Sequence, residues 1–461
     1  MGLRTSHAAA TLNPVVIVGG GLSGLAAGVG LSSRGIPVLL LEQRPALGGR
    51  ASSFIDEVTG DVIDNGQHVL IAGYVRTMRF LETIGTQDRL AVQKVPTLLF
   101  HHPRRGFCTF RQVSLPPPLN LFGGIILTDL FSTADKFRLL RAGAALRSFR
   151  EEGSGAAAGM TVAQWLDAVG QSSETERSWW EPLAIAIMNE HIDVASALVF
   201  IRSLRTAFLA HPRGAALALP TVGLSELYVD AARSFIERHA GEVRCRTDVV
   251  VTLAGEEGML GVRTKEGEEI GCSALILAVP SLKAPALLPA HLREAGFLSE
   301  IESIPMSPIV SIHLWFRTDF MRQDHLGVIG KRIQSVFNRR RICREEAKAG
   351  GGHVSVVISA GHEEAGMTNE QLSDLAWEDL RDIYGRVVSS PTHTVVLRER
   401  RATISCQPAV EKIRPGPRTP VHNLFLAGDW TATGYPSTIE GAITSGDRCV
   451  DLVAAFLGRT P

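Results

Sequence analysis

The chain has 461 residues, and its 47 Lys and Arg balance 47 Asp and Glu, so the formal net charge is zero. A protein without an excess of basic residues lacks the positive electrostatic potential that attracts the phosphates of DNA or RNA, which argues against a nucleic-acid partner. The six cysteines are scattered without a CxxC pair, which argues against disulfides and zinc, predicts no metal site and fits a reducing, cytoplasmic compartment. The sequence shows no secretory signal and no run of about 18 uncharged apolar residues, so we expect no membrane span.

The length predicts about two to three domains, and the alternation of short apolar runs with amphipathic runs predicts an α/β or α+β fold. In chain order, the first elements are a strand at Val15 to Val18, a helix at Leu22 to Ser33 and a strand at Val38 to Leu41. Leu115 to Phe131 then carries one charge in seventeen residues, and Glu151 to Gly159 is typical of a short linker.

A predominantly helical stretch follows from about Thr161 to Phe208. Its apolar positions exceed one helical face, so it is buried on several sides or lines an apolar cavity. Beyond it we predict helices near Leu224 to Arg238, Asn369 to Tyr384 and Thr438 to Phe456, and strands at Val249 to Leu253, Leu260 to Thr264, Ala274 to Ala278, Ile309 to Phe316, Val354 to Ser359, Thr394 to Arg398 and Leu424 to Ala427.

Gly19, Gly21 and Gly24 form a GxGxxG sequence between the first strand and the first helix. Glycines at this spacing allow a tight turn and close backbone approach to a pyrophosphate, whose charge the helix N-terminus stabilises. Glu42 ends the second strand, where an acid accepts hydrogen bonds from a ribose diol and favours an unphosphorylated adenosine ribose over NADP. The alternative is a glycine-rich turn in an unrelated α/β domain. The order of strand, glycine turn, helix, second strand and acid favours the nucleotide site.

Two further motifs resemble those of the flavin amine oxidase and carotene desaturase group. EQRPALGGR (Glu42 to Arg50) resembles its E-x-R-x-x-x-GGR element, along which FAD runs, and Leu424 to Gly446 is similar to its second FAD motif. The resemblance implies that Gly428 and Asp429 approach the phosphate and ribityl hydroxyls. It also implies a helix N-terminus, beginning at Thr438 and Ile439, aimed at the flavin pyrimidine edge, where it stabilises the charge of reduced flavin.

The run VVVTL (Val249 to Leu253) resembles the strand whose backbone holds adenine, with Val250 as the expected contact. The resemblance implies an α/β fold with a Rossmann-type FAD-binding domain of the glutathione reductase-like or amine oxidase-like kind and a discontinuous α+β substrate domain. We predict the FAD-binding domain from residues 14–75, 220–285 and 420–461, and the substrate domain from 76–219 and 286–419. The predicted FAD contacts are Gly19, Gly21, Leu22, Ser23, Gly24, Glu42, Gln43, Arg44, Gly48, Gly49, Arg50, Gly66, Gln67, His68, Val250, Gly428, Asp429, Thr438 and Ile439.

Amine oxidases of this fold usually hold a lysine near the flavin, and that position falls on Ser311, which disfavours amine oxidation. DNGQHVLIAGY (Asp64 to Tyr74) instead resembles the plant-type phytoene desaturases, which act on long isoprenoid hydrocarbons. Together with LAGDWTATGYPSTIEGA, it resembles the hydroxysqualene dehydroxylases of bacterial squalene and hopanoid synthesis, with Tyr435 where a smaller apolar residue is expected. That resemblance implies reductive removal of the allylic hydroxyl of hydroxysqualene to give squalene, with hydride from reduced FAD.

Allylic C–O cleavage needs a proton donor for the departing hydroxide and an apolar shell that excludes water. Asp64, His68 and Tyr74 are the candidate catalytic donors, because their segment should pass close to the isoalloxazine. The structural alternatives are that Asp64 orients backbone, that His68 packs in the core or on the flavin, and that Tyr74 begins a helix.

In the helical stretch, Trp179 and Trp180 are interpreted as core aromatics, with tunnel lining as the alternative. Asn189 and His191 are interpreted as helix-terminal polar groups rather than catalytic ones.

The sequence contains no convincing second dinucleotide-binding turn, so NAD(P)H would reach the flavin transiently or another reductase would supply electrons. A C30 substrate is nearly insoluble, so we expect peripheral contact with the inner face of the cell membrane, with Leu115 to Phe131 as the docking segment. The alternative for that segment is a buried loop and strand. Two other functions stay open, namely a desaturase in which oxidised FAD takes hydride from a carotene-like chain, and a non-catalytic FAD-scaffolded lipid-binding protein.

Overall fold

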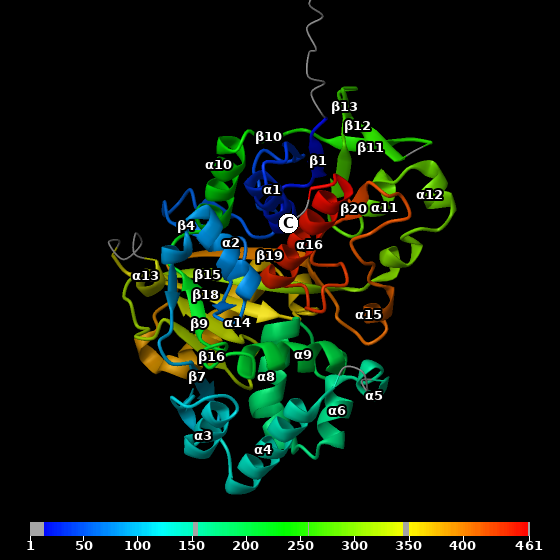
Figure 1. The fold of residues 1–461 in the computed structure, drawn as a ribbon. Coiled ribbons are helices and arrows are strands. Elements are labelled where there is room, and N and C mark those ends of the chain that lie inside the picture. Colours follow the sequence, from blue (N-terminus) through cyan, green and yellow to red (C-terminus); the bar gives the residue numbers. More distant parts are fainter. Residues whose placement is uncertain (1–12, 151–154, 257, 344–349, 460–461) are drawn as a thin grey trace, which may run out of the picture.

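The computed structural model describes residues 13–150, 155–256, 258–343 and 350–459. A five-stranded parallel sheet with the order β10-β2-β1-β14-β20 lies in the upper half of the molecule (Figure 1). Its strands come from three distant parts of the chain and are β1 (Val15–Val18), β2 (Val38–Leu41), β10 (Glu242–Arg244), β14 (Ala274–Leu277) and β20 (Leu424–Leu426). The residues of β1, β2, β14 and β20 are all buried, because helices cover one face of the sheet and the other face shares a core cluster with apolar residues of the strands at 249–255 and 258–264.

Helices from both ends of the chain cover this sheet, and α1 lies directly against α16. The helices around the sheet are α1 (Leu22–Ser33), α2 (Val75–Ile84), α10 (Asp230–Arg238) and α16 (Ile439–Phe456). The predicted bounds of β1, α1 and β2 are confirmed, while the helix predicted from Leu224 begins with a π turn at Ser225–Val229 before α10.

The described residues also form three smaller antiparallel sheets. They are β11 (Val249–Gly255), β12 (Gly258–Thr264) and β13 (Glu269–Gly271); β3 (Ser53–Ile55) and β4 (Val62–Asp64); and β5 (Leu70–Ile71), β9 (Leu217–Pro220) and β6 (Leu90–Val92). The short helices α11 (Ala284–Leu287) and α12 (Ala290–Glu294) follow β14. The predicted domain boundary at residues 219/220 falls inside β9, and the division into two domains stays a prediction.

The predicted β-rich block forms a seven-stranded sheet with the order β19-β15-β18-β17-β16-β7-β8. Its strands are β7 (Thr97–His102), β8 (Gly106–Arg111), β15 (Met306–Phe316), β16 (His325–Val328), β17 (Ser335–Asn338), β18 (Gly352–Ser359) and β19 (His393–Ile404). Helix α13 (Arg339–Ile342) lies between β17 and β18, α14 (Asn369–Tyr384) lies between β18 and β19, and α15 (Val410–Ile413) connects β19 to β20. The apolar stripe of α14 packs on this sheet, and its predicted bounds are confirmed. The strands β7, β8, β16 and β17 were not predicted from the sequence.

The lower part of the molecule is helical (Figure 1). It contains α3 (Leu119–Leu127), α4 (Thr133–Ser148), α5 (Gly155–Ala158), α6 (Val162–Ala168), α7 (Ser173–Thr175), α8 (Glu181–Met188) and α9 (Ala197–Phe208). The helical stretch predicted from Thr161 is thus confirmed. Of the predicted linker, residues 151–154 lie outside the described residues and 155–158 form α5, so the linker interpretation fails for its second half. The alternative of a buried loop and strand for Leu115 to Phe131 is also wrong, because α3 occupies it.

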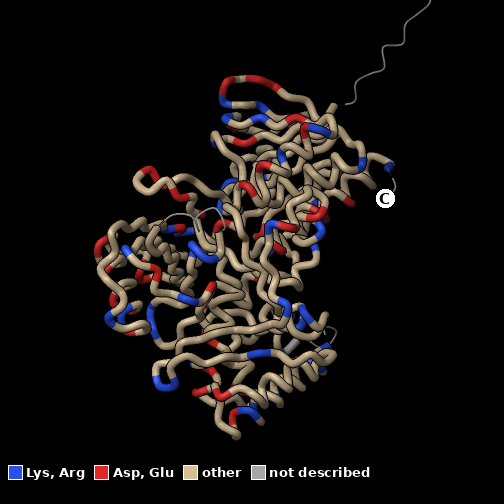
Figure 2. The backbone as a smooth tube through the Cα atoms, turned by 90° about the vertical axis from the view of Figure 1, so that its left-hand side faces the viewer, with Lys and Arg blue, Asp and Glu red and all other residues tan. Residues whose placement is uncertain are grey.

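Charged side chains of both signs occur at both ends of the molecule, in keeping with its zero net charge (Figure 2). Among the described residues, no helix is long and apolar enough to cross a membrane.

Candidate active site

The glycine turn between β1 and α1 has the geometry of an anion cradle. Gly19 has φ +111°, and a Cβ on Gly24 would lie 2.0 Å from the Gly19 carbonyl oxygen, so neither position accepts a side chain without strain. A Cβ on Gly21 would meet no atom within 4 Å, and Gly21 gives α1 no side-chain cap. The open space before this uncapped helix N-terminus, where Leu22 and Ser23 present their backbone N–H groups, suits a pyrophosphate.

Glu42 follows β2 and is held against this turn. Its two carboxylate oxygens accept hydrogen bonds from the backbone N–H groups of Gly20 and Arg44, each at 2.8 Å. A carboxylate has about four acceptor sites, so Glu42 keeps capacity for ribose hydroxyls. The neighbouring Gln43 points outward, where its amide oxygen accepts a hydrogen bond from Lys283 at 2.7 Å.

The GGR run connects the glycine turn to the C-terminal motif. The backbone N–H of Gly48 donates to the Gly20 carbonyl at 2.8 Å, and Arg50 Nη2 lies 2.6 Å from Asp429 Oδ1. The adjacent carboxylate of Asp429 raises the pKa of Arg50. Two segments 379 residues apart in the sequence therefore meet beside the turn.

Arg414, which was not predicted from the sequence, fixes the path of the C-terminal motif. Its guanidinium is fully buried and donates to four backbone carbonyls of the 429–435 loop at 2.5 to 3.3 Å. Glu411, at 2.8 Å, balances its charge. A buried arginine that satisfies four carbonyls of one loop holds that loop in one conformation. No sequence motif marks such a residue, because its partners are backbone atoms.

The start of α16 is as predicted, with Thr438 as the N-cap and Ile439 as the first helical residue. Glu440, in the first turn, was not singled out from the sequence. Its side chain is 1% exposed and accepts hydrogen bonds from the backbone N–H groups of Arg76 and Thr77 at 3.0 and 2.9 Å, so it caps α2. This contact joins the C-terminal motif to the segment that ends at Tyr74.

Val250 lies in a bulge of β11, where the register with β12 skips it. Val250 is 45% exposed, so it lies at the surface of the strand. The backbone groups of a bulged residue lie outside the ladder and are available to a purine edge. Just before the strand, the N–H of Thr247 donates to the Glu42 carbonyl at 2.9 Å, which places β11 next to the proposed ribose site.

The prediction of Asp64 as a proton donor needs correction. One carboxylate oxygen accepts hydrogen bonds from the Ser53 hydroxyl and the Leu224 N–H, and the other lies 3.0 Å from Arg339 Nη1. Both partners of this ion pair are buried, with side-chain exposures of 0% for Asp64 and 1% for Arg339. Both carboxylate oxygens are thus engaged by donors of the protein itself rather than presented to a substrate. Asp64 is instead a positioning residue, and its partner Arg339 was missed because it lies 275 positions later.

Gly66 lies between two polar side chains from different elements. A Cβ on Gly66 would lie 3.6 Å from Ser311 Oγ and 3.8 Å from His68 Cε1. Ser311 is 1% exposed, and neither its hydroxyl nor the amide nitrogen of the neighbouring buried Gln67 has a hydrogen-bond partner among the described residues. Buried donors without partners are rare unless a ligand supplies the acceptor. The carbonyls and ring nitrogens of an isoalloxazine, and the oxygen of a bound substrate, are acceptors of this kind, so these residues fit the predicted cofactor site.

His68 and Tyr74 differ in what they can do with a proton. His68 Nδ1 lies 2.6 Å from the Gly66 carbonyl and must donate to it, which leaves Nε2 with the lone pair. Burial lowers the pKa of His68, so the ring is neutral near pH 7 and acts as an acceptor rather than an acid. Burial and the nearby Glu440 raise the pKa of the half-buried Tyr74, which keeps its proton and can donate it in a hydrogen bond.

Trp179 and Trp180 are buried in the core, which confirms the simpler interpretation of both. The Trp179 ring packs on Phe110, with ring centroids 4.7 Å apart. Asn189 is the C-cap of α8, with φ 51°, and its amide nitrogen donates to Thr403 Oγ1 at 2.9 Å.

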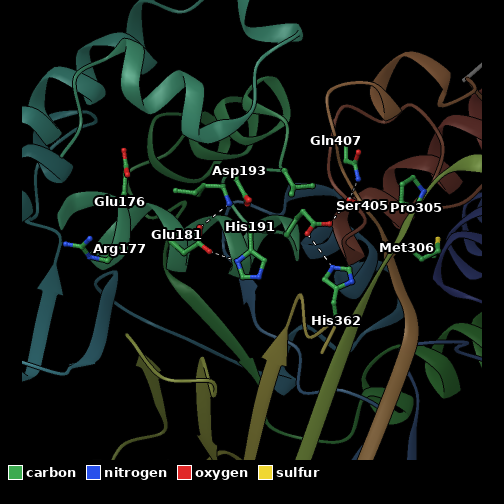
Figure 3. A pocket seen from close by; sticks show the side chains of 13 residues that line it. Glu176, Arg177, Glu181, His191, Asp193, Pro305, Met306, His362, Ser405 and Gln407 are labelled. Carbon is green, nitrogen blue, oxygen red and sulfur yellow. Dashed lines mark hydrogen bonds and ion pairs between the residues drawn. The ribbon is translucent and has the colours of Figure 1, made fainter. Parts of the chain in front are cut away.

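A cavity of about 690 Å³ opens beside the helical part (Figure 3). Its ionisable lining residues are Glu176, Arg177, Glu181, Glu190, His191, Asp193 and His362. His191 pairs with Glu181 at 2.5 Å, and Glu190 accepts a hydrogen bond from Ser405. A long hydrocarbon would strip water from these charges, which costs several kcal/mol, so this cavity does not suit an apolar chain.

Comparison with known proteins agrees with this geometry. Residues 22–454 match the family described as flavin containing amine oxidoreductase. The hydroxysqualene dehydroxylase of Sinorhizobium fredii (strain NBRC 101917 / NGR234) is 30% identical over 450 residues, which cover 95% of this chain and 97% of the relative. The chloroplastic/chromoplastic 15-cis-phytoene desaturase of Solanum lycopersicum is 24% identical over 456 residues, which cover 95% of this chain and 77% of the relative. The crystal structure of an oxidoreductase from Methanosarcina mazei has a TM-score of 0.75 at 15% identity, covering 95% of this chain and 100% of that chain, which shows a shared fold.

The family match runs from the start of α1 to the last turns of α16 and so spans the helix that follows the glycine turn, the GGR run and the C-terminal motif. The alternative of a non-catalytic lipid-binding protein is thereby set aside. The chain belongs to the flavin-containing amine oxidoreductase family and is an FAD-dependent oxidoreductase.

Proposed function

We propose that this protein removes the allylic hydroxyl of hydroxysqualene reductively and releases squalene and water. The observation that carries the proposal is the similarity, over 95% of the chain, to a relative named hydroxysqualene dehydroxylase. In this reaction an allylic C–O bond breaks and a C–H bond forms, and one hydride and one proton are consumed. Bound in its reduced form, FAD supplies the hydride.

We infer that the cofactor lies along the predicted motifs. The backbone N–H groups at the start of α1 would bind the pyrophosphate, and Glu42 would accept hydrogen bonds from the adenosine ribose. Val250 would meet adenine through its backbone, and Asp429 would lie near the ribityl chain. The N-terminus of α16 would face the pyrimidine edge, where its partial positive charge favours the reduced flavin.

The chemistry at the leaving hydroxyl would fall to the residues around Gly66. The buried Ser311 hydroxyl is available to donate a hydrogen bond to the substrate oxygen, and Tyr74 is protonated at neutral pH. His68 would accept a hydrogen bond at Nε2 and orient the alcohol or a water molecule. A serine at the position where amine oxidases hold a lysine provides a neutral donor, which suits an alcohol better than an amine.

The electrons would come from NAD(P)H bound transiently or from a separate reductase. The acidic lining of the cavity in Figure 3 repels the phosphates of a nicotinamide dinucleotide, so that cavity is not its proposed site.

The test is anaerobic. Holoenzyme carrying chemically reduced FAD is mixed with detergent-dispersed hydroxysqualene, the flavin absorbance is followed, and the product is identified by mass spectrometry. We expect reoxidation with squalene formed in equal amount, and no reoxidation with squalene in place of the alcohol. In Ser311→Ala with normal FAD content, loss of one hydrogen bond to the substrate predicts reoxidation about tenfold slower. A flavin that stays reduced while the alcohol is recovered would refute the proposal.

A desaturase is the second candidate, favoured by the similarity to the Solanum lycopersicum phytoene desaturase. It runs in the opposite direction, because oxidised FAD would take hydride from a polyene precursor. The desaturase would be favoured if phytoene bleached the flavin of oxidised holoenzyme and hydroxysqualene did not reoxidise the flavin of reduced enzyme.

A further inference from the structure

The loop before α3, α3 itself and the start of α4 lie at the lower end of the molecule (Figure 1), and several of their apolar residues are exposed. We call these residues the α3–α4 face. They are Leu115 (49% exposed), Leu119 (53%), Ile126 (58%), Leu127 (74%) and Phe137 (69%). The other side of α3 is buried against the protein, so the helix is apolar on both sides but covered on only one. Single exposed apolar residues are ordinary, whereas a cluster of this size marks a contact surface.

The same part of the chain is strongly basic. Residues 97–150 contain eight Lys and Arg against two Asp, a formal net charge of +6 in a chain whose net charge is zero. One of the two acids, Asp135, is buried and paired with Arg138 at 2.9 Å. Cations also lie at the end of α3, where Lys136 donates to the Ile126 carbonyl at 2.7 Å and Arg105 to the Asp129 carbonyl at 2.8 Å. Lys136 and Arg105 therefore form a basic rim beside the exposed apolar residues, and the exposed Asp129 is the one acid of this span that lies next to them.

We propose that the α3–α4 face docks on an anionic phospholipid surface. The apolar side chains would enter the acyl boundary, and the basic rim would contact the headgroups, because a lipid bilayer combines an apolar interior with a negatively charged surface. Charge complementarity selects this occupant over a second copy of the chain, since two identical basic rims repel each other. The proposal goes beyond the dehydroxylation reaction and holds for any substrate of the enzyme.

The test uses full-length, FAD-loaded protein and vesicle flotation. Wild type should float with vesicles of equal parts phosphatidylcholine and phosphatidylglycerol, and far less with phosphatidylcholine alone. The double variant Ile126→Ser/Leu127→Ser should bind the anionic vesicles at least about tenfold more weakly, since two buried apolar side chains are lost. Arg141→Gln, one helical turn after Phe137 on α4, should weaken that binding about fivefold.

Matched control variants lie on the hairpin loop and strand β12, at the upper end of the molecule (Figure 1). Leu260→Ser removes a side chain that is 62% exposed there, and Lys265→Gln removes an exposed charge, so both should bind as wild type does. FAD absorbance confirms that each variant folds. Unchanged flavin reoxidation by detergent-dispersed substrate separates a docking defect from a failure of the proposed reaction.

Equal binding to neutral and anionic vesicles, or wild-type binding by both α3–α4 variants, would overturn the proposal. A concentration-dependent dimer in sedimentation that the double variant abolishes would overturn it as well, since the face would then be covered by a second copy.

Discussion

Gly21→Ala is expected to weaken FAD binding about 100-fold while the apoprotein keeps nearly its full stability. A methyl group on Gly21 would meet no atom within 4 Å, and the backbone angles of φ −76° and ψ 179° suit alanine. The free energy of unfolding should therefore fall by less than about 1 kcal/mol, as for an N-cap change. The same methyl group fills the space where a phosphate oxygen would accept hydrogen bonds from backbone N–H groups. Losing one or two charge-assisted hydrogen bonds of about 1.5 kcal/mol each removes up to about 3 kcal/mol of binding free energy.

Two further variants complete this experiment. In Gly24→Ala the new Cβ would lie 2.0 Å from the Gly19 carbonyl oxygen, so overpacking of about 1 to 3 kcal/mol should destabilise the apoprotein itself. Gly366→Ala is the control, because its Cβ would meet no atom within 4 Å and it lies outside the predicted FAD motifs. Calorimetric titration of apoprotein with FAD and urea unfolding measure the two quantities. If Gly21→Ala bound FAD with wild-type affinity, the glycine turn would not be the pyrophosphate site.

Three other outcomes are expected. Arg339→Met leaves Asp64 buried without its countercharge and should lower the free energy of unfolding by about 3 to 5 kcal/mol in urea denaturation, and a change near zero would contradict the buried ion pair. Burial lowers the pKa of His325 to about 4, so the unfolded chain takes up this proton first and stability should fall as the pH drops from about 6.5 to about 4. His325→Phe should flatten that slope, and an unchanged slope would assign it to other groups. Arg414→Met removes the donors that hold the 429–435 loop and should reduce the FAD retained on gel filtration, whereas a wild-type FAD content would argue against the positioning role.

Much of the fold could be predicted because its signals are local. The bounds of α1 and α14 follow from apolar periodicity and from caps within the same turn, such as the Thr368 capping box before α14. The need for glycine in the GxGxxG turn is also local, since Gly19 and Gly24 contact each other within the turn. The strands β7 and β8 were missed because they mix His, Arg and apolar residues in a hairpin without a clear alternation.

By itself, the sequence of this protein determined the flavin-binding class, the helices with a complete apolar stripe and the parallel strands that are apolar throughout. Only the tertiary structure decided which polar side chains face one another. It paired Asp64 with Arg339, brought Ser311 from β15 to Gly66 and left the apolar face of α3 in solvent. The physical reason is the distance along the chain over which each signal acts. Helix propensity and apolar periodicity act over a few residues, whereas a buried charge or hydroxyl needs partners that folding brings from hundreds of residues away.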